Sequence, residues 1–288
     1  MKTLKEYILE ARQKGIAIGH FNISNLEVLC AVFNSAKKLN QPVIIGVAEG
    51  ERDFIGVKQV SALVKSLREE HNFPIFLNAD HSYSFERVKE AIDAGFDAVI
   101  IDGAKLSLDE NIALTKKCVD YANASGRDVL VEAELGYIGG SSKMLDEIPT
   151  DVKLDPKFLT SVEDAKRFVT ETGINLFAPA IGNIHGMLKG GVDPSLNIVR
   201  IREIYAATLL PLVLHGASGN TADDIREAIS AGMAIVHINT ELRVAYKKAL
   251  INSLEKNKDE IAPYKYMKEV VLEVEKVVDD KIKIFAKL

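Results

Sequence analysis

Short apolar runs alternate with longer amphipathic segments along nearly the whole chain, and this alternation constrains the fold more than any other feature. The runs of strand length lie at residues 16–22, 42–46, 74–79, 97–102, 128–134, 175–181, 211–215 and 234–238. A segment with helical character follows each run, at 24–39, 53–70, 84–94, 108–124, 162–172, 196–206, 221–231 and 240–256. Strands that alternate with helices predict right-handed crossovers and a parallel sheet. Eight such units predict an α/β fold of the (β/α)8 TIM barrel type.

Two further helices are expected at the ends of the chain. Residues 3–14 predict an extra N-terminal helix that Gly15 ends, because glycine is common just past a helix. Residues 258–288 predict a C-terminal helical extension, which we expect to pack on the barrel bottom or against another subunit. Barrels of roughly 250 residues fold as one unit, so we expect a single domain over residues 1–288.

Composition excludes several classes of partner. The net charge of -5 argues against nucleic acid, because proteins that bind it usually carry a basic patch. The N-terminus lacks an apolar signal segment, and no run approaches the ~20 apolar residues that span a bilayer. Cys30 and Cys118 have no metal-type spacing and are expected to be free thiols. These features predict a cytoplasmic protein with no membrane partner.

Histidines end three of the predicted strands. Asp80-His81 closes the third run, and His185 and His215 close two later ones, each followed by glycine. The carboxyl ends of barrel strands converge on one mouth, which would bring these four residues together. Three imidazoles with an open fourth position are typical of a catalytic zinc site. The alternative is that each histidine is a hydrogen-bonded core residue.

Two stretches break the regular pattern. Residues 136–160 form a connection of about 25 residues, far longer than the 2–6 usual in such units, and predict a lid or a disordered loop. Residues 182–191 are rich in glycine and contain Lys189. Glycine lets backbone N–H groups approach a phosphate, and lysine adds charge. This second stretch is therefore either a phosphate-binding turn or simply a flexible one.

The motifs at the strand ends resemble, in order, those of the class II, zinc-dependent ketose-bisphosphate aldolases. The matching segments lie between residues 21 and 242, most of the chain: Asp80-His81, 101–104, 132–140, 182–186, 215–219 and 240–242. Each motif alone is weak, but six in the same order are specific. The resemblance implies a (β/α)8 barrel, in agreement with the strand count.

The resemblance also implies roles for individual residues. His81, His185 and His215 match the zinc ligands, and Asp80 matches the general acid/base that moves a proton on the C4 hydroxyl. Glu134 and Asp102 match carboxylates that orient a histidine ligand or hold the metal in an alternate position. The expected substrate-binding residues are Asn22, Gly186, Lys189, Gly216, Ala217, Ser218, His237, Asn239 and Thr240. Another divalent ion could replace Zn²⁺ at imidazole ligands, and a monovalent cation could assist phosphate binding.

The sequence departs from the family pattern on the substrate side of the pocket. Ser141 and Ser142 stand where the family usually has glutamates, one of them often assigned proton transfer. His237 replaces a common asparagine, and Asn239 and Ala48 also differ. His237 could be an extra metal ligand, a hydroxyl-binding group or a core residue, and we favour hydroxyl binding. These departures support the reaction class better than the identity of the sugar.

Three functional hypotheses follow. The first is reversible aldol cleavage of a ketose 1,6-bisphosphate, with fructose 1,6-bisphosphate ahead of tagatose 1,6-bisphosphate, giving dihydroxyacetone phosphate and glyceraldehyde 3-phosphate. The second is an aldolase for another phosphorylated keto sugar or a deoxy sugar acid phosphate. The third is a catalytically lapsed, zinc-binding barrel. Class I chemistry needs a Schiff-base lysine, and we interpret Lys105, the one lysine directly after a strand, as a solvated charge. A homodimer or homotetramer is expected from the C-terminal extension and the resemblance.

Overall fold

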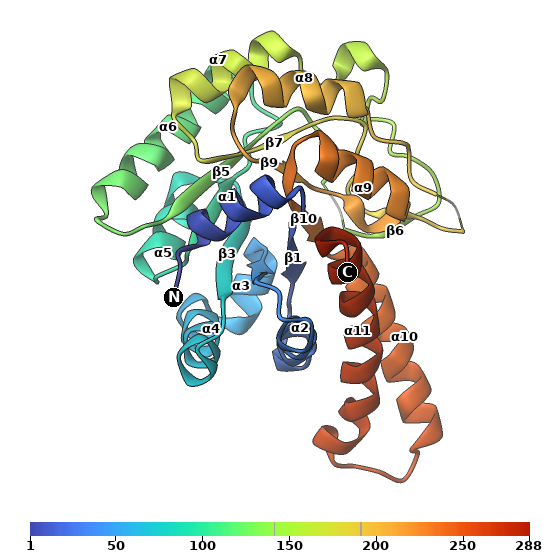
Figure 1. The fold of residues 1–288 in the computed structure, drawn as a ribbon. Coiled ribbons are helices and arrows are strands. Elements are labelled where there is room, and N and C mark those ends of the chain that lie inside the picture. Colours follow the sequence, from blue (N-terminus) through green and yellow to red (C-terminus); the bar gives the residue numbers. More distant parts are fainter. Residues whose placement is uncertain (141, 191) are drawn as a thin grey trace.

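A closed barrel of eight parallel strands forms the centre of the molecule (Figure 1). The computed structural model describes residues 1–140, 142–190 and 192–288. The barrel strands are β1 (Ile18–Asn22), β2 (Val43–Val47), β3 (Ile75–Ser82), β4 (Ala98–Ile101), β5 (Leu130–Leu135), β7 (Leu176–Pro179), β9 (Leu212–Leu214) and β10 (Met233–Ile238). They pair in chain order, and β10 closes the barrel against β1 with His237 beside His20. The predicted (β/α)8 barrel is thereby confirmed.

Helices follow the strands and surround them. They are α2 (Leu26–Leu39), α3 (Glu49–Ile55), α4 (Val57–His71), α5 (Phe85–Asp93), α6 (Leu108–Ala124), α7 (Val162–Thr172), α8 (Ile198–Thr208), α9 (Ala222–Ala231) and α10 (Thr240–Lys256). Ser, Thr or Asn side chains cap most of their N-termini, as Ser107 does for α6 and Thr221 for α9. The segment expected as one helix over 53–70 is two helices, because Gly56 adopts φ +95°, which side-chain-bearing residues rarely do.

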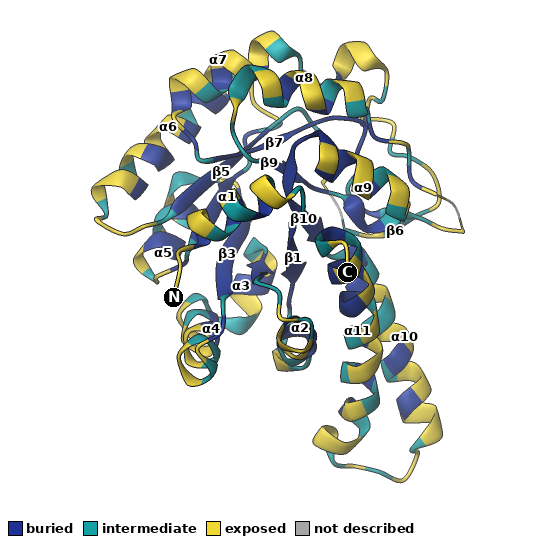
Figure 2. Cartoon of the chain, viewed as in Figure 1, coloured by how far each residue is buried: buried dark blue, intermediate teal, exposed yellow. Residues whose placement is uncertain are grey.

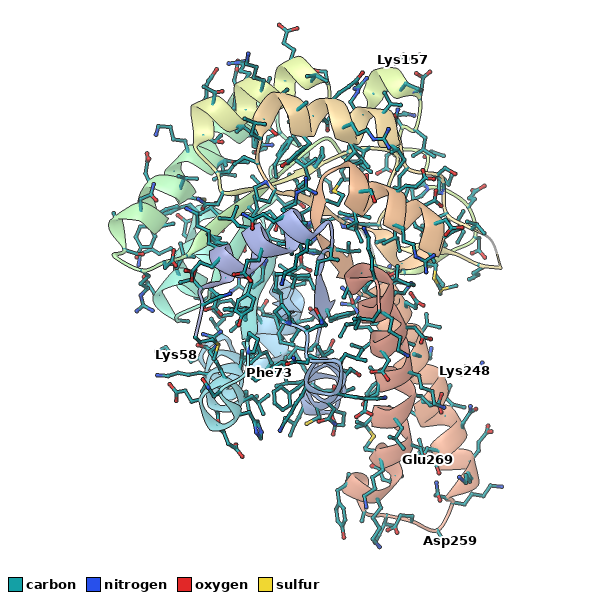
Figure 3. The ribbon with its side chains drawn as sticks, in the orientation of Figure 1. Lys58, Phe73, Lys157, Lys248, Asp259 and Glu269 are labelled. Atoms are coloured by element: carbon teal, nitrogen blue, oxygen red, sulfur yellow. The ribbon has the colours of Figure 1, made fainter. Side chains whose placement is uncertain are left out.

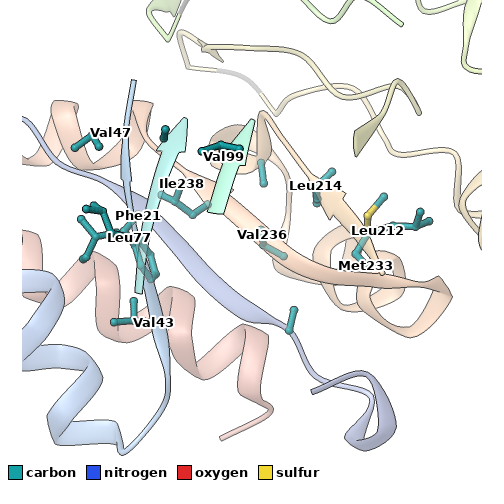
Figure 4. Packing of buried hydrophobic residues seen from close by; sticks show 14 of the residues in the cluster. Phe21, Val43, Val47, Leu77, Val99, Leu212, Leu214, Met233, Val236 and Ile238 are labelled. Carbon is teal, nitrogen blue, oxygen red and sulfur yellow. The ribbon is translucent and has the colours of Figure 1, made fainter. Parts of the chain in front are cut away.

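Alternation along the strands separates two buried layers. Every second side chain points outward into the layer between strands and helices, where Phe21, Val43, Leu77 and Leu214 belong to one buried apolar cluster. Figure 4 shows Phe21 beside Leu77 in this cluster. The side chains between them point into the barrel. In the half of the barrel where the strands begin, called the lower half below, these inward side chains are apolar. They are Ile18, Ile44, Phe76, Ala98, Leu130, Leu176, Val213, Ala234 and Ile235. Figure 2 shows the barrel strands almost entirely buried, with exposed residues on the outer faces of the helices.

The predicted N-terminal helix, α1 (Leu4–Lys14), lies across the lower end of the barrel (Figure 1). Its buried side chains Leu4, Ile8 and Ala11 pack on the apolar layer just described. Thr3 and Glu6 form a capping box at its start, and Gly15 ends it in the left-handed conformation. The end where the strands begin is therefore closed.

The C-terminal helix, α11 (Pro263–Ala286), does not pack on the barrel bottom, where α1 already lies. Its second half packs on α2 and on the strand layer through Val274, Val278 and Phe285. The Phe285 carbonyl accepts a hydrogen bond from the Ala17 N–H at 3.0 Å, just before β1. This half of α11 thus covers the side of the barrel, so the expected packing on the barrel bottom was wrong, while packing against another subunit stays a prediction.

The remainder of α11 pairs with α10 in a hairpin that projects beyond the barrel (Figure 1). Met267, Val270 and Ala249 form a small separate apolar cluster inside it. Figure 3 shows Lys248, Asp259 and Glu269 on this projection. Within the described residues, none of the helices has the length and hydropathy that crossing a bilayer requires.

The long connection after β5 lies at the opposite end from α1. Met144–Leu145 forms β6, which pairs in parallel with β8 (Met187–Leu188) from the glycine-rich stretch. The Ile138 carbonyl accepts a hydrogen bond from the His185 N–H at 2.8 Å. The two irregular stretches predicted from the sequence are therefore joined to each other over the barrel mouth. Ser141 and Gly191 lie outside the described residues.

Candidate active site

Polar side chains replace apolar ones in the upper half of the barrel interior. The same alternation that points Ile18 inward also points in the next residues of its parity, His20 and Asn22 on β1. The buried polar residues of this layer are His20, Asn22, Asn78, Asp80, Glu132, Glu134, His215 and His237. Burying so many polar groups without function is costly, so this layer is the candidate site.

Three histidines and a glutamate converge in this layer. Ligand atoms of His81, Glu134, His185 and His215 all lie within 4.8 Å of one another. The centroid of the His81 ring lies 4.8 Å from that of His185 and 5.0 Å from that of His215. The centroids of His185 and His215 are 5.9 Å apart. The rings are inclined to one another by 62° to 86° rather than stacked. Inclined rings can each direct a nitrogen at one common point.

Other groups fix the orientation of two of these rings. Nε2 of His215 lies 2.7 Å from Oε1 of the fully buried Glu132, and its Nδ1 lies 2.8 Å from Oε1 of Glu134. Nδ1 of His185 lies 2.7 Å from the Gly139 carbonyl, which leaves Nε2 as its free nitrogen. Such outer partners commonly set the ring orientation and tautomer of metal-binding histidines. The role of Glu132 was not predicted from the sequence.

Backbone geometry aims His81. The pairing of β3 with β4 shifts register between Ala79 and Ser82, and His81 adopts φ +41°, in the left-handed region. A bulge of this kind re-aims a side chain next to a functional site. Nδ1 of His81 lies 3.1 Å from Oδ2 of Asp102 and 3.5 Å from Oε1 of Glu134. The two predicted carboxylates, Asp102 and Glu134, are thus both placed against this ring.

The four-residue cluster fits a divalent metal ion. Nδ1 of His215 and Oε1 of Glu134 are buried, and within the described residues neither makes a directed hydrogen bond. A cation between them would satisfy both atoms. Three imidazoles and a carboxylate are a donor set that suits Zn²⁺ and other borderline divalent ions. His81, His185 and His215 would hold the ion, with Glu134 at its side.

Asp80 lies beside the cluster, and its position is fixed from several sides. Its Oδ1 is 3.7 Å from Nε2 of His81, and its Oδ2 accepts a hydrogen bond from Nδ2 of Asn22 at 2.7 Å. The buried Arg52 side chain donates to the Asp80 backbone carbonyl at 3.1 Å and to the Ser82 hydroxyl at 3.0 Å. Arg52 therefore holds the end of β3, and it was not predicted.

Charge coupling shifts the pKa values in the cluster. Burial alone would raise the pKa of Asp80, but the imidazoles of His81 and His237 hold it well below its usual range. Burial likewise opposes ionisation of Glu134, yet His81 and His215 lower the pKa of this carboxyl to about 2. The same carboxylates overcome the burial of His81 and raise its pKa to about 9. The carboxylates therefore favour positive charge at this cluster, and a bound cation would replace the imidazole protons that supply it in the metal-free protein.

A hydrogen-bonded chain links Asp80 to the rim. Nδ2 of Asn22 also donates to Oε2 of the buried Glu51 at 3.0 Å, and Oε1 of Glu51 pairs with Arg243 at 2.6 Å. Ser24 donates to the same carboxylate at 3.2 Å. Glu51 and Arg243 were missed in the sequence, where each has the appearance of an ordinary helix charge.

Two more imidazole contacts run across the barrel interior. His20 stacks on His237 with centroids 3.5 Å apart and planes at 4°, and His237 stacks on His215 at 4.0 Å and 25°. Burial lowers the pKa of His20 to about 4. Burial, together with His20 and His215, lowers the pKa of His237 well below its usual range. His20 and His237 are thus neutral near pH 7, and the position of His20 in this stack was not predicted.

The expected substrate-binding residues separate into two groups. Those that line the inner cavity at the mouth are Asn22, Gly186, Gly216, Ser218, His237, Asn239 and Thr240. Ala217 is buried behind this lining. Lys189 lies outside it, with an exposed side chain and its Nζ 2.8 Å from Oδ1 of Asp146. Ser142 lines the cavity, whereas its predicted neighbour Ser141 lies outside the described residues.

Glycines form the turns on the phosphate side. Gly216 has φ +66°, and a Cβ there would lie 2.1 Å from the Ile184 carbonyl oxygen. Gly186 has φ +106°, and a Cβ there would lie 2.7 Å from the Lys143 carbonyl oxygen. Both positions therefore require glycine. They bring the backbone close to the start of α10 at Thr240, which also lines the cavity.

Comparison with known proteins places this site in a family. A family model described as "Fructose-bisphosphate aldolase class-II" matches residues 2–287. The chain belongs to that family. It is therefore an aldolase, a lyase of carbohydrate metabolism, and class-II aldolases are generally zinc-dependent.

Named relatives of this aldolase cover nearly its whole length. The "Fructose-bisphosphate aldolase" of Staphylococcus aureus (strain Mu50 / ATCC 700699) is 39% identical over 288 residues, which are 98% of this chain and 96% of that protein. The "Probable fructose-bisphosphate aldolase" of Bacillus subtilis (strain 168) is 39% identical over 270 residues, 92% of this chain and 90% of that protein.

Solved structures agree with the barrel. The YdjI aldolase from Escherichia coli K12 is 32% identical, with a TM-score of 0.82 over 98% of this chain and 96% of that chain. The fructose-bisphosphate aldolase of Campylobacter jejuni has the same TM-score of 0.82 at 22% identity, over 98% of this chain and 94% of that chain, which supports the fold alone.

Proposed function

We propose that this aldolase cleaves a ketose 1,6-bisphosphate reversibly, with fructose 1,6-bisphosphate as the first candidate, to dihydroxyacetone phosphate and glyceraldehyde 3-phosphate. The observation that carries the proposal is the position of Asp80, whose Oδ1 lies 3.7 Å from Nε2 of His81 at the edge of the metal-binding cluster. A carboxylate next to a metal centre is the arrangement that this cleavage needs. The names of the 39% identical relatives support the same substrate.

The residues divide the chemistry between them. When bound by His81, His185 and His215, Zn²⁺ would polarise the ketose carbonyl as a Lewis acid. Asp80, ionised because of its lowered pKa, takes the proton of the C4 hydroxyl while the C3–C4 bond breaks. The electron pair of that bond stays on the three-carbon phosphate fragment as an enediolate, which takes up a proton at C3 from solvent to give dihydroxyacetone phosphate. Asn22 holds the carboxylate through its hydrogen bond to Oδ2, so that Oδ1 stays available. In the synthetic direction Asp80 returns the proton.

The C1 phosphate fits the turn side of the cavity. Gly186 and Gly216 allow close approach of the backbone, and Ser218 and Thr240 offer hydroxyls. The start of α10 adds the partial positive charge of a helix N-terminus. Asn239 and Ser142 lie between this region and the outer part of the cavity. A monovalent cation would assist phosphate binding here, and Lys189 would have to leave Asp146 to contribute.

One observation favours a different phosphorylated keto sugar as the second candidate. The described lining of the outer cavity, near Ala48, contains Arg243 as its single arginine and no lysine. Arg243 is paired with Glu51, and Glu49 lies nearby in the same lining. A second phosphate would therefore meet a nearly neutralised cation. A substrate with an uncharged distal end, such as a ketose 1-phosphate, fits this charge distribution.

The decisive experiment measures turnover across a small panel of sugars. Purified zinc-loaded protein is assayed for release of triose phosphate from fructose 1,6-bisphosphate, tagatose 1,6-bisphosphate and fructose 1-phosphate. The proposal expects the highest kcat/KM on fructose 1,6-bisphosphate. A higher value on fructose 1-phosphate would select the second candidate. Bound zinc without turnover on any ketose phosphate would indicate a catalytically lapsed barrel.

The cellular setting follows from the same proposal. The expected partner is a small sugar phosphate, with neither nucleic acid nor membrane, and the expected location is the cytoplasm. The projecting α10–α11 hairpin favours a homodimer or homotetramer, which size-exclusion chromatography with light scattering would measure.

A further inference from the structure

The barrel leaves room for the stack of His20 on His237. The two residues are Cα partners on adjacent strands, β1 and β10, and their rings are almost parallel at 3.5 Å. On the next strand, Gly46 leaves the room that the His20 ring occupies, because a Cβ there would lie 2.0 Å from Cε1 of His20. His20 is 0% exposed. The pair is therefore held tightly on both sides.

The stacked rings do not form a second metal site. Nitrogens of His20 and His237 and an oxygen of Asp80 come within 4.8 Å of one another, which is close enough for a shared ion. An imidazole nitrogen, however, directs its lone pair in the plane of its ring. Two planes that are parallel to 4° and separated by 3.5 Å cannot both contain the same ion. Stacking therefore assigns the pair another purpose.

The stack fixes the orientation of the His237 ring at the wall of the inner cavity. Nδ1 of His237 lies 3.5 Å from Oδ1 of Asp80, and its Nε2 is buried without a hydrogen-bond partner among the described residues. His237 lines the inner cavity, whereas His20 does not. Because His20 covers one face of this ring and His215 the other, the ring cannot rotate out of the cavity. An unpartnered imidazole nitrogen on a ring that lines the cavity can form a hydrogen bond with a ligand hydroxyl.

The neighbours of His237 indicate which hydroxyl it meets. Its ring stacks on the metal-site residue His215 at 4.0 Å and borders Asp80 at 3.5 Å. If the C2 carbonyl lies at the histidine cluster and the C4 hydroxyl at Asp80, the carbon between them is C3. We propose that His20 is a positioning residue that holds His237 against the C3 hydroxyl of the substrate. This inference rests on the proposed function for the placement of C2 and C4.

The test measures binding instead of turnover. Zinc-loaded protein is titrated calorimetrically with dihydroxyacetone phosphate and with hydroxyacetone phosphate, which lacks the C3 hydroxyl. Wild-type protein should prefer dihydroxyacetone phosphate. His20→Ala removes the stack and should reduce this preference about fivefold to tenfold, the range expected for one hydrogen bond. His20→Phe keeps a stacking ring without nitrogens and should retain the preference within about twofold.

Two controls distinguish a loss of the positioning of His237 from general damage to the barrel or to the metal site. Phe76→Leu alters a buried residue in the lower, apolar half of the same barrel and should leave the preference unchanged. Bound zinc is measured in every variant, because a metal loss in His20→Ala would mean that His20 acts through His215. The inference is overturned if His20→Ala weakens the binding of both ligands equally, or if it leaves the preference for dihydroxyacetone phosphate unchanged. It is also overturned if the wild-type protein does not distinguish the ligands.

The inference and the proposed function can fail separately. If no ketose bisphosphate is cleaved but the binding preference depends on His20 as described, the function is wrong and the positioning role stands. If cleavage proceeds and His20→Ala lowers kcat and raises KM with the preference intact, the positioning role is wrong.

Discussion

The amide of Asn22 donates a 2.7 Å hydrogen bond to the carboxylate of Asp80, and the same nitrogen donates to Glu51 at 3.0 Å. One oxygen of Asp80 is thereby engaged, while the other, Oδ1, faces the histidines. Because a hydrogen bond to the charged form favours ionisation, Asn22 also helps to keep Asp80 anionic. In the proposed mechanism, proton transfer thus depends on a single free carboxylate oxygen, Oδ1 of Asp80.

Asp80→Asn tests that dependence. An amide of the same shape cannot accept the hydroxyl proton, so kcat on fructose 1,6-bisphosphate should fall by about 10²–10⁴-fold. The metal-binding histidines are unchanged, and zinc content measured by atomic absorption should stay near one ion per chain. If the variant retained wild-type kcat, another group would have to be the base.

Glu132→Gln probes the partner behind His215. The carboxylate lies 2.7 Å from Nε2 of His215, and its replacement removes the charge that orients the ring. Loss of such a partner typically costs 10–100-fold in metal affinity, and we expect a decrease of about that size in competition with a fluorescent chelator. Glu163→Gln on the exposed surface of α7 serves as the matched control and should bind zinc as the wild type does. Equal affinities in all three proteins would rule out the orienting role.

Removal of the metal should stop the reaction reversibly. His81, His185 and His215 would supply the ligands, and the coordinates place no lysine among the described lining of the inner cavity that could form a Schiff base instead. Dialysis against a chelator should therefore abolish triose phosphate release, and added Zn²⁺ should restore it. Trapping with borohydride should label no lysine. Full activity after verified zinc removal would contradict the assignment.

His20 should make the metal-free protein sensitive to acid. Its pKa is about 4 in the folded state and 6.5 in a model peptide, so below pH 6.5 the unfolded chain binds a proton that the folded chain does not. The free energy of unfolding is therefore unaffected by this proton above pH 6.5. It decreases as the pH falls toward 4, by up to about 3 kcal/mol. Urea unfolding of wild type and His20→Phe between pH 4 and 7 measures this. The difference in unfolding free energy between the two proteins should change with pH across that window, and parallel pH profiles would contradict the prediction.

Much of the fold followed from periodicity, and the exceptions have physical causes. The eight strands and their helices were located because apolar runs and amphipathic windows alternate regularly. The break at Gly56 was missed because helical periodicity continues on both sides of it. The position of α11 could not be read from its own sequence. An apolar helix face does not say which surface it covers, and the lower end was already closed by α1.

The site was predicted from residues at strand ends, and this choice explains what was missed. His20 lies two residues before Asn22, and Glu132 two residues before Glu134, so each points into the same interior as its neighbour. Applying the two-residue alternation backward from the strand ends would have found both. Glu51 and Arg52 come from helix α3, where no strand parity applies. Their burial depends on how α3 packs against β3, which only the three-dimensional structure reveals.

Helix α1 seals one end of the barrel, and this has a consequence for traffic through the enzyme. The reactant and both cleavage fragments must enter and leave through the same opening, the barrel mouth beside the β6–β8 pair. Attachments to the N-terminus would sit on the far side of the molecule, away from that exit.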